Sequence, residues 1–108
     1  MGKFAAMKLL LTGEPVGARE ALAMGLVSEV VPDDQVLERA LALADTIASL
    51  PPLAIAQIKE VVLAGADGSL EAGLALERKA FEVLFDTQDQ SEGMKAFIEK
   101  RKPNFKGS

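Results

Sequence analysis

Apolar residues recur at intervals of three and four along most of the chain, which is the spacing of amphipathic helices. The most regular stretch runs from Val36 to Ala48, where the apolar positions form one continuous stripe. Similar stretches predict further helices over residues 3–11, 18–24, 53–63, 70–86 and from 87 onward. The β-branched run 26–31, bounded by Gly25 and Pro32, is predicted to be an extended connector, because it is too short to build a sheet.

Residues with special backbone preferences indicate where these helices end. Gly13 and Gly25 are typical of left-handed C-terminal caps. Gly65 and Gly68 indicate the loop after the fourth helix. Pro103 is expected to end the last helix and to be followed by a loose chain end.

Other residues indicate where helices begin. Asp33 or Asp34 is the expected N-cap of the third helix, and Ser69 that of the fifth. Thr87, followed three residues later by a glutamine, resembles a capping box at the start of the last helix. Pro52 cannot continue a helix but favours a new start, so it separates the third helix from the fourth.

The composition also favours helices over sheet. The chain has 17 Ala and 15 Leu against 8 Val, 4 Ile and 3 Thr. We therefore predict an all-α fold of about six short helices, forming a single domain over residues 1–108 without internal repeats.

Missing residue types exclude whole classes of chemistry. Without Cys or His, the chain has no thiol nucleophile, no imidazole base and no zinc site of the usual ligands. With no Trp or Tyr and a net charge of −4, we expect no nucleic-acid partner. The chain has neither an apolar run long enough to span a bilayer nor a signal-peptide pattern, so we expect no membrane partner.

Two carboxylate pairs are the nearest candidates for acid–base catalysis, Asp33–Asp34 and Glu77–Glu82, but neither is expected to be catalytic. The first lies where a helix cap is needed, and the second lies on the polar side of a helix. The glycines of 12–17 and 65–68 lack the Lys-Ser/Thr of a phosphate loop. No calcium-loop spacing is present, so we expect no metal site.

Basic residues gather at the C-terminal end, which carries a net charge of +4 on an otherwise acidic chain through Lys95, Lys100, Arg101, Lys102 and Lys106, against Glu99. Such a cluster either meets a phosphate of a small ligand or ends a solvated helix. The helices are also apolar beyond their main stripes, at Leu43, Leu50 and Leu76. So small a bundle is not expected to bury them all, which leaves a patch for a partner.

Several segments in register resemble the C-terminal part of the enoyl-CoA hydratase/isomerase (crotonase) family. They are Leu11–Val16, Ala18–Leu22, Gly25–Pro32, Leu50–Ala54 with Lys59, Gly73–Arg78, and Glu92–Phe105. The match covers residues 2–106. Gly17 departs from the pattern, in which a capping Asp, Ser or Asn is commoner, and this puts the start of the second helix in question.

The resemblance implies that this chain is the C-terminal helical region, concerned with trimerisation and close to CoA, of a crotonase-type fold without its β/α spiral core. In the family, that core carries the oxyanion-hole amides and the catalytic glutamates. It would lie upstream of Met1, so no residue here receives a catalytic role. The intact protein is then expected to be an enzyme, a lyase that hydrates trans-2-enoyl-CoA to 3-hydroxyacyl-CoA in fatty-acid metabolism, because the ending Phe97–Phe105 most resembles short-chain hydratases. The alternative is a stand-alone, non-catalytic helical oligomerisation module.

The resemblance also names binding residues and partners. Phe97 and Lys100 match the Phe and Lys of the family's last helix that approach the adenine and phosphates of CoA, often from a neighbouring subunit. From the residues alone, Phe97 equally suits core packing with Met94, and Lys100 a solvated helix end. The implied partners are an acyl-CoA substrate and further copies of the chain, as a trimer or dimer of trimers. No separate cofactor is expected, because CoA is part of the substrate, and the expected location is the cytoplasm.

Overall fold

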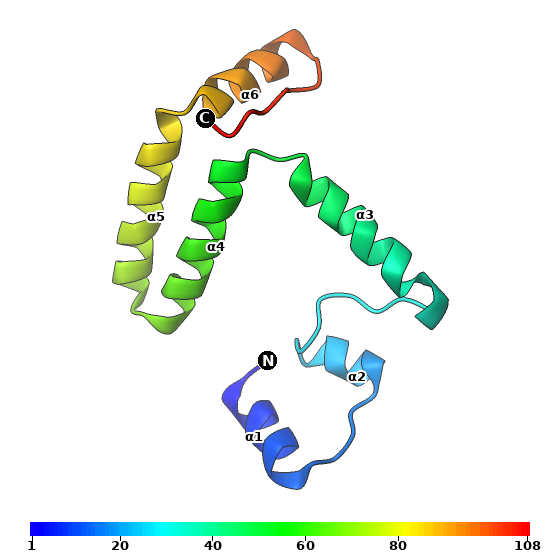
Figure 1. Ribbon diagram of the computed structural model, residues 1–108. Helices are drawn as coiled ribbons and strands as arrows, with labels where there is room; N and C mark the ends of the chain where they lie inside the picture. Colours follow the sequence, from blue (N-terminus) through cyan, green and yellow to red (C-terminus); the bar gives the residue numbers. More distant parts are fainter. The chain divides into compact units, whose positions relative to one another are not determined.

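The computed structural model describes residues 1–108 and consists of helices without β-strands (Figure 1). The elements are α1 (Lys3–Thr12), α2 (Ala18–Ala23), the 3₁₀ turn η1 (Asp33–Gln35), α3 (Val36–Ala48), α4 (Pro52–Asp67), α5 (Leu70–Phe85) and α6 (Gln88–Glu99). The predicted all-α class is confirmed. The chain divides into two compact units, Met1–Ala40 and Leu41–Ser108, so that α3 begins in one and continues into the other.

In the first unit, α1 and α2 end on left-handed glycines, as predicted. Gly13 has a φ of 64° and Gly25 a φ of 77°. The amide of Gly25 donates to the carbonyl of Leu22 (3.1 Å), and that of Leu26 donates to the carbonyl of Ala21 (2.9 Å). This paired arrangement satisfies carbonyls that the helix end would otherwise leave free.

The expected N-cap of α3 is wrong. Neither Asp33 nor Asp34 caps the helix with its side chain, because both lie inside η1. The amide of Gln35 donates to the carbonyl of Pro32 (2.9 Å), so the backbone itself satisfies that donor. Helix α2 begins at Ala18, as predicted, although Gly17 before it provides no side-chain cap.

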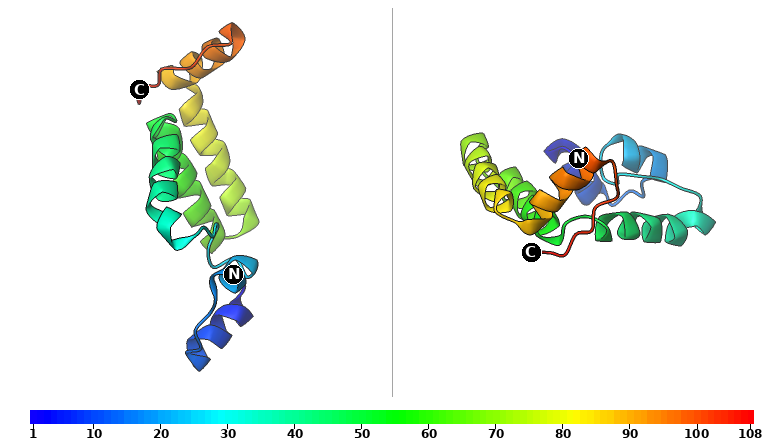
Figure 2. Two further views of the ribbon diagram at one scale, coloured as in Figure 1. Left: turned by 90° about the vertical axis from the view of Figure 1, so that its right-hand side faces the viewer. Right: turned by 90° about the horizontal axis from the view of Figure 1, so that it is seen from above.

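In the second unit, α4 and α5 pack side by side as an antiparallel hairpin (Figures 1 and 2). Gly65 was expected in the loop, but it lies within α4, which continues to Asp67. A Cβ built on Gly73 would come within 3.4 Å of the Cα of Gly65. Gly65 and Gly73 therefore allow the backbones of α4 and α5 to approach closely. The loop between the two helices is confined to Gly68 and Ser69.

Side-chain caps open the last two helices, as predicted. The Ser69 hydroxyl accepts a hydrogen bond from the amide of Ala72 (3.2 Å), and the Thr87 hydroxyl accepts one from the amide of Gln90 (3.2 Å). Caps of this kind stabilise a helix by about 1 kcal/mol each. They fix where α5 and α6 begin.

The expected loose chain end is wrong. Helix α6 stops at Glu99, before Pro103, because Lys100 adopts a left-handed conformation with a φ of 53°. Residues 101–108, called here the C-terminal segment, then fold back along α6 (Figures 1 and 2). At its far end, a Cβ built on Gly107 would lie 3.3 Å from Cγ of Pro52, which opens α4.

Asp89 attaches the far half of this segment. Its carboxylate accepts one hydrogen bond from the amide of Lys106 (2.7 Å) and another from the amide of Gly107 (2.8 Å). Its own amide donates to the carbonyl of Ser108 (3.0 Å). Asp89 is only 3% exposed and is the one buried charged residue of the chain. The backbone donors compensate the cost of burying its charge.

Glu92, one turn further along α6, attaches the near half. It accepts two hydrogen bonds from the guanidinium of Arg101 (2.6 and 2.9 Å) and one from the amide of Asn104 (2.9 Å). The hydrogen bonds from Arg101, and secondly that from Asn104, lower the pKa of Glu92 to about 2. Asp89 and Glu92 are called the carboxylate pair below.

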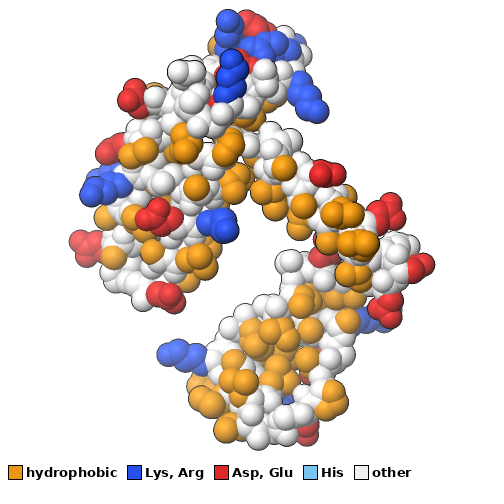
Figure 3. All heavy atoms as spheres, viewed as in Figure 1, with side chains coloured by type: hydrophobic (Ala, Val, Ile, Leu, Met, Phe, Trp, Pro, Cys, Tyr) orange, Lys and Arg blue, Asp and Glu red, His pale blue; other side chains and the backbone are white.

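Few apolar side chains are buried. Only Ala21, Ala80 and Ala96 are, whereas Phe4 is 94% exposed. The chain exposes 8974 Å², while two separate compact globules of these lengths would expose roughly 7,000 Å². Apolar side chains accordingly cover much of the surface seen in Figure 3. No single helix is long and apolar enough to cross a bilayer; one bent pair, Asp33–Ala48 with Pro52–Asp67, reaches that length and composition when taken together.

We expect the isolated 108-residue chain to self-associate, because its exposed apolar faces gain by leaving water. Sedimentation at several concentrations should show an average mass that rises with concentration, and a hydrophobic dye should bind. A monomer mass that is independent of concentration, without dye binding, would contradict this expectation.

We also expect the near half of the C-terminal segment, which Glu92 holds, to stay attached at pH values where ordinary carboxylates are protonated. Because the pKa of Glu92 is lowered from 4.5 to about 2, its contribution is complete above pH 4.5 and is lost as the pH falls through about 2. The amide resonance of Asn104, followed by NMR during acid titration, should move with a midpoint near 2. A midpoint near 4.5 would show that the contact does not form in solution.

Candidate functional site

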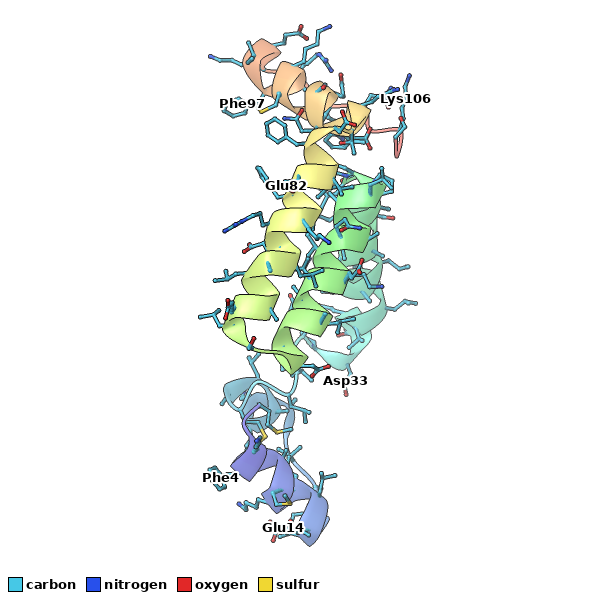
Figure 4. The ribbon with its side chains drawn as sticks, turned by 90° about the vertical axis from the view of Figure 1, so that its left-hand side faces the viewer. Phe4, Glu14, Asp33, Glu82, Phe97 and Lys106 are labelled. Carbon is cyan, nitrogen blue, oxygen red and sulfur yellow. The ribbon has the colours of Figure 1, made fainter.

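The two residues singled out from the sequence lie together at the C-terminal end of α6. Phe97 is 83% exposed and Met94 is 56% exposed, so the ring of Phe97 is not part of a core. Figure 4 shows it projecting outward from α6. An exposed aromatic face of this kind offers a surface on which a planar base can stack.

Lys100 directly follows the last turn of that helix. Its amide donates to the carbonyl of Phe97 (3.3 Å), and this hydrogen bond fixes the backbone of Lys100 relative to that of Phe97. It is the only non-glycine residue with a positive φ, at 53°. Long side chains rarely adopt this conformation because the Cβ crowds the following carbonyl.

The surroundings of Lys100 are electropositive. Arg101 forms ion pairs with Glu92 (2.6 Å) and Glu99 (2.5 Å), and no carboxylate pairs with the exposed lysines of this region, Lys95, Lys100, Lys102 and Lys106. Basic side chains accordingly gather at this end of the second unit in Figure 3. Unpaired ammonium groups beside an exposed aromatic ring are suited to a ligand that joins phosphate to a planar base.

An apolar groove of about 430 Å³ lies beside the attachment of the C-terminal segment, because both Asp89 and Phe105 line it. Its lining comes from the start of α4, the end of α5, α6 and the C-terminal segment, and includes Leu53, Phe81, Phe85, Met94 and Phe105. Sequence reasoning missed this groove because its walls come from parts of the chain that only the fold brings together. It also missed the carboxylate pair; two acids three residues apart on a helix with a basic end were the available signal.

The carboxylate pairs weighed as acid–base catalysts do not form a site. Asp33, Asp34, Glu77 and Glu82 are all exposed. No three acidic side chains converge as metal ligands would. The one buried carboxylate, that of Asp89, is fully engaged with backbone amides.

Comparison with known sequences places this geometry in context. The family model described as "Enoyl-CoA hydratase/isomerase" matches residues 1–108. The chain is 45% identical over 107 residues to the 2,3-dehydroadipyl-CoA hydratase of Escherichia coli, covering 99% of this chain and 42% of that protein. It is 48% identical over 106 residues to a probable enoyl-CoA hydratase of Rhizobium meliloti, covering 98% and 41%. It is also 45% identical over 103 residues to the (E)-benzylidenesuccinyl-CoA hydratase of Thauera aromatica, covering 95% and 40%.

Solved structures agree with the sequence relatives. An enoyl-CoA hydratase from Bacillus anthracis superposes with a TM-score of 0.91 at 40% identity, over 96% of this chain and 40% of that one. An enoyl-CoA hydratase/isomerase from Mycobacterium paratuberculosis superposes with a TM-score of 0.92 at 34% identity, over 100% and 43%. The chain thus spans about two fifths of the length of these relatives. On sequence and on fold alike, it belongs to the enoyl-CoA hydratase/isomerase family.

Proposed function

We propose that this chain is the CoA-proximal helical region of an enoyl-CoA hydratase, an enzyme that adds water to the double bond of a trans-2-enoyl-CoA. The supporting observation is the match over almost the whole chain to relatives named as hydratases of CoA thioesters. Those names differ in the acyl group but share CoA and the addition of water. The proposal therefore concerns the CoA end of the substrate and leaves the acyl group unspecified.

The exposed end of α6 supports this assignment. Phe97 offers an aromatic face for the adenine, and Lys100 offers an unpaired ammonium for a phosphate. The two are linked through one backbone hydrogen bond of 3.3 Å, so their separation is set by the helix end. Arg101 has less to offer a ligand, because Glu92 and Glu99 already neutralise it.

Catalysis itself is assigned to residues outside this chain. Stabilising the enolate-like transition state of a thioester requires preorganised donors at the developing oxyanion, each worth about 3 to 4 kcal/mol. Among the residues described, the buried carboxylate of Asp89 and the half-buried one of Glu92 are occupied by the C-terminal segment. Neither is available to activate water.

The exposed apolar faces are assigned to contacts with the rest of the enzyme and with further copies of it, as a trimer or dimer of trimers. The same faces favour a second candidate, a stand-alone helical module that associates without catalysis. The two candidates differ in ligand, because only the first predicts that CoA is bound at Phe97 and Lys100.

The 108-residue chain by itself is expected to show no hydratase activity, because the oxyanion donors and the catalytic carboxylates are assigned to other residues. Following the absorbance of crotonyl-CoA with purified chain should give the rate of a buffer blank. A loss of absorbance that scales with the amount of chain would contradict the assignment of catalysis to other residues.

CoA binding by the same chain is expected to be weak and to involve the end of α6. Amide resonances of Phe97 to Lys102 should shift on titration, with a dissociation constant in the millimolar range that rises with salt, because exposed charges are screened. Lys100→Gly removes the ammonium and suits the left-handed backbone. It should weaken binding by about 1.5- to 5-fold, the equivalent of an exposed charge pair worth ~0.2 to 1 kcal/mol.

Lys79→Ala, which removes an exposed ammonium from α5, is the matched control and should leave the affinity unchanged. Shifts centred on α1 with none at Phe97 to Lys102, or equal effects of the two substitutions, would overturn the assignment of this site.

A further inference from the structure

The left-handed conformation of Lys100 calls for a physical cause. Helices commonly end on a residue of this conformation, and that residue is usually glycine because it has no Cβ to crowd the following carbonyl. Gly13 and Gly25 play this part in α1 and α2. At the end of α6 the chain uses a lysine, so something beyond local preference must hold its backbone.

The contacts made by the residues after Lys100 hold its backbone in this conformation. The amide of Arg101 donates to the carbonyl of Ala96 (3.0 Å), which closes the helix end. The guanidinium of Arg101 is held by both oxygens of Glu92, nine residues earlier in the chain. The chain can meet both conditions only by reversing direction immediately after α6.

The rest of the C-terminal segment is held in the same direction. Asn104 donates to Glu92, and Lys106 and Gly107 donate to Asp89, so the segment is attached at two points one helical turn apart. These three hydrogen bonds come from backbone amides, and the two from Arg101 come from a fork of two N–H groups, which restricts rotation as well as distance. A chain attached in this way leaves Lys100 no room to return to a helical or extended conformation.

We propose that Asp89 and Glu92 are positioning residues: by holding the C-terminal segment along α6 they force the chain to reverse at Lys100, and so fix its backbone and the direction in which its side chain leaves the helix end. Asp89 and Glu92 act in this way in the chain without any ligand. The consequence that the backbone of Lys100 need not be ordered when its side chain meets a phosphate rests on the proposed function.

Glu99 provides a matched control within the same cluster. It also pairs with Arg101, through Nε at 2.5 Å, but it makes no hydrogen bond to the backbone of the C-terminal segment. Glu92→Gln and Glu99→Gln change the net charge equally and each removes one partner of Arg101. Only the first substitution weakens the attachment of the segment.

The experiment compares the full 108-residue chain with its Glu92→Gln, Asp89→Asn and Glu99→Gln variants by NMR and hydrogen exchange. In Glu92→Gln and Asp89→Asn, we expect the amides of Asn104, Lys106 and Gly107 to lose about tenfold or more of their protection. The backbone carbon shifts of Lys100 should move away from left-handed values. Glu99→Gln should keep both properties within about twofold of the unmodified chain, and the helix content measured by circular dichroism should not change.

A rescue variant separates positioning from general stabilisation. Lys100→Gly removes the free-energy cost of placing a residue with a Cβ in the left-handed conformation. Adding it to Glu92→Gln should therefore restore much of the lost protection of the amides of Asn104 and Lys106. A residue that merely stabilised the helices would not be rescued at that position.

The proposal is overturned if Lys100 keeps left-handed shifts in both Glu92→Gln and Asp89→Asn, if Glu99→Gln acts as strongly as Glu92→Gln, or if the variants lose helix content throughout. These outcomes are independent of CoA. Absence of CoA-induced shifts in a chain whose segment responds as expected would instead refute the proposed function alone.

Discussion

The carboxylate of Asp89 organises the C-terminal end of this protein. A charge at 3% exposure is costly unless it is compensated, and here two consecutive backbone amides compensate it. Those donors belong to residues 17 and 18 positions later, so satisfying the charge requires the chain to turn back after α6. The reversal at Lys100 and the position of Phe105 on the wall of the apolar groove both follow from this requirement.

Burial of apolar surface contributes little by comparison. Ordinary domains gain most of their stability from this source, but here the buried apolar residues are three alanines. Local hydrogen bonds, such as the caps at Ser69 and Thr87, define the helices instead. The chain spans about two fifths of its relatives' length, and its helices show apolar faces to solvent.

Most features determined by neighbouring residues were predictable from the sequence; the N-cap expected at Asp33 or Asp34 was not found. The ends at Gly13 and Gly25 and the starts at Ser69 and Thr87 depend on a turn of chain at most, and all four are as expected. Gly65 was misplaced because its helical position depends on Gly73, across the hairpin. The C-terminal segment was expected to be loose because its attachment depends on partners up to 18 positions away. Phe97 and Lys100 came from family resemblance, which could not show the left-handed backbone between α6 and Arg101.

Hydrogen bonds to Asp89 and Glu92, rather than apolar burial, hold the end of this chain. Hydrogen exchange of the unmodified chain, resolved by residue, measures this attachment directly. We predict that the amides of Asn104, Lys106 and Gly107 exchange as slowly as those in the middle of α6, although they lie outside any helix. Exchange of these three amides at the rate of an unstructured peptide, while α6 remains protected, would contradict it.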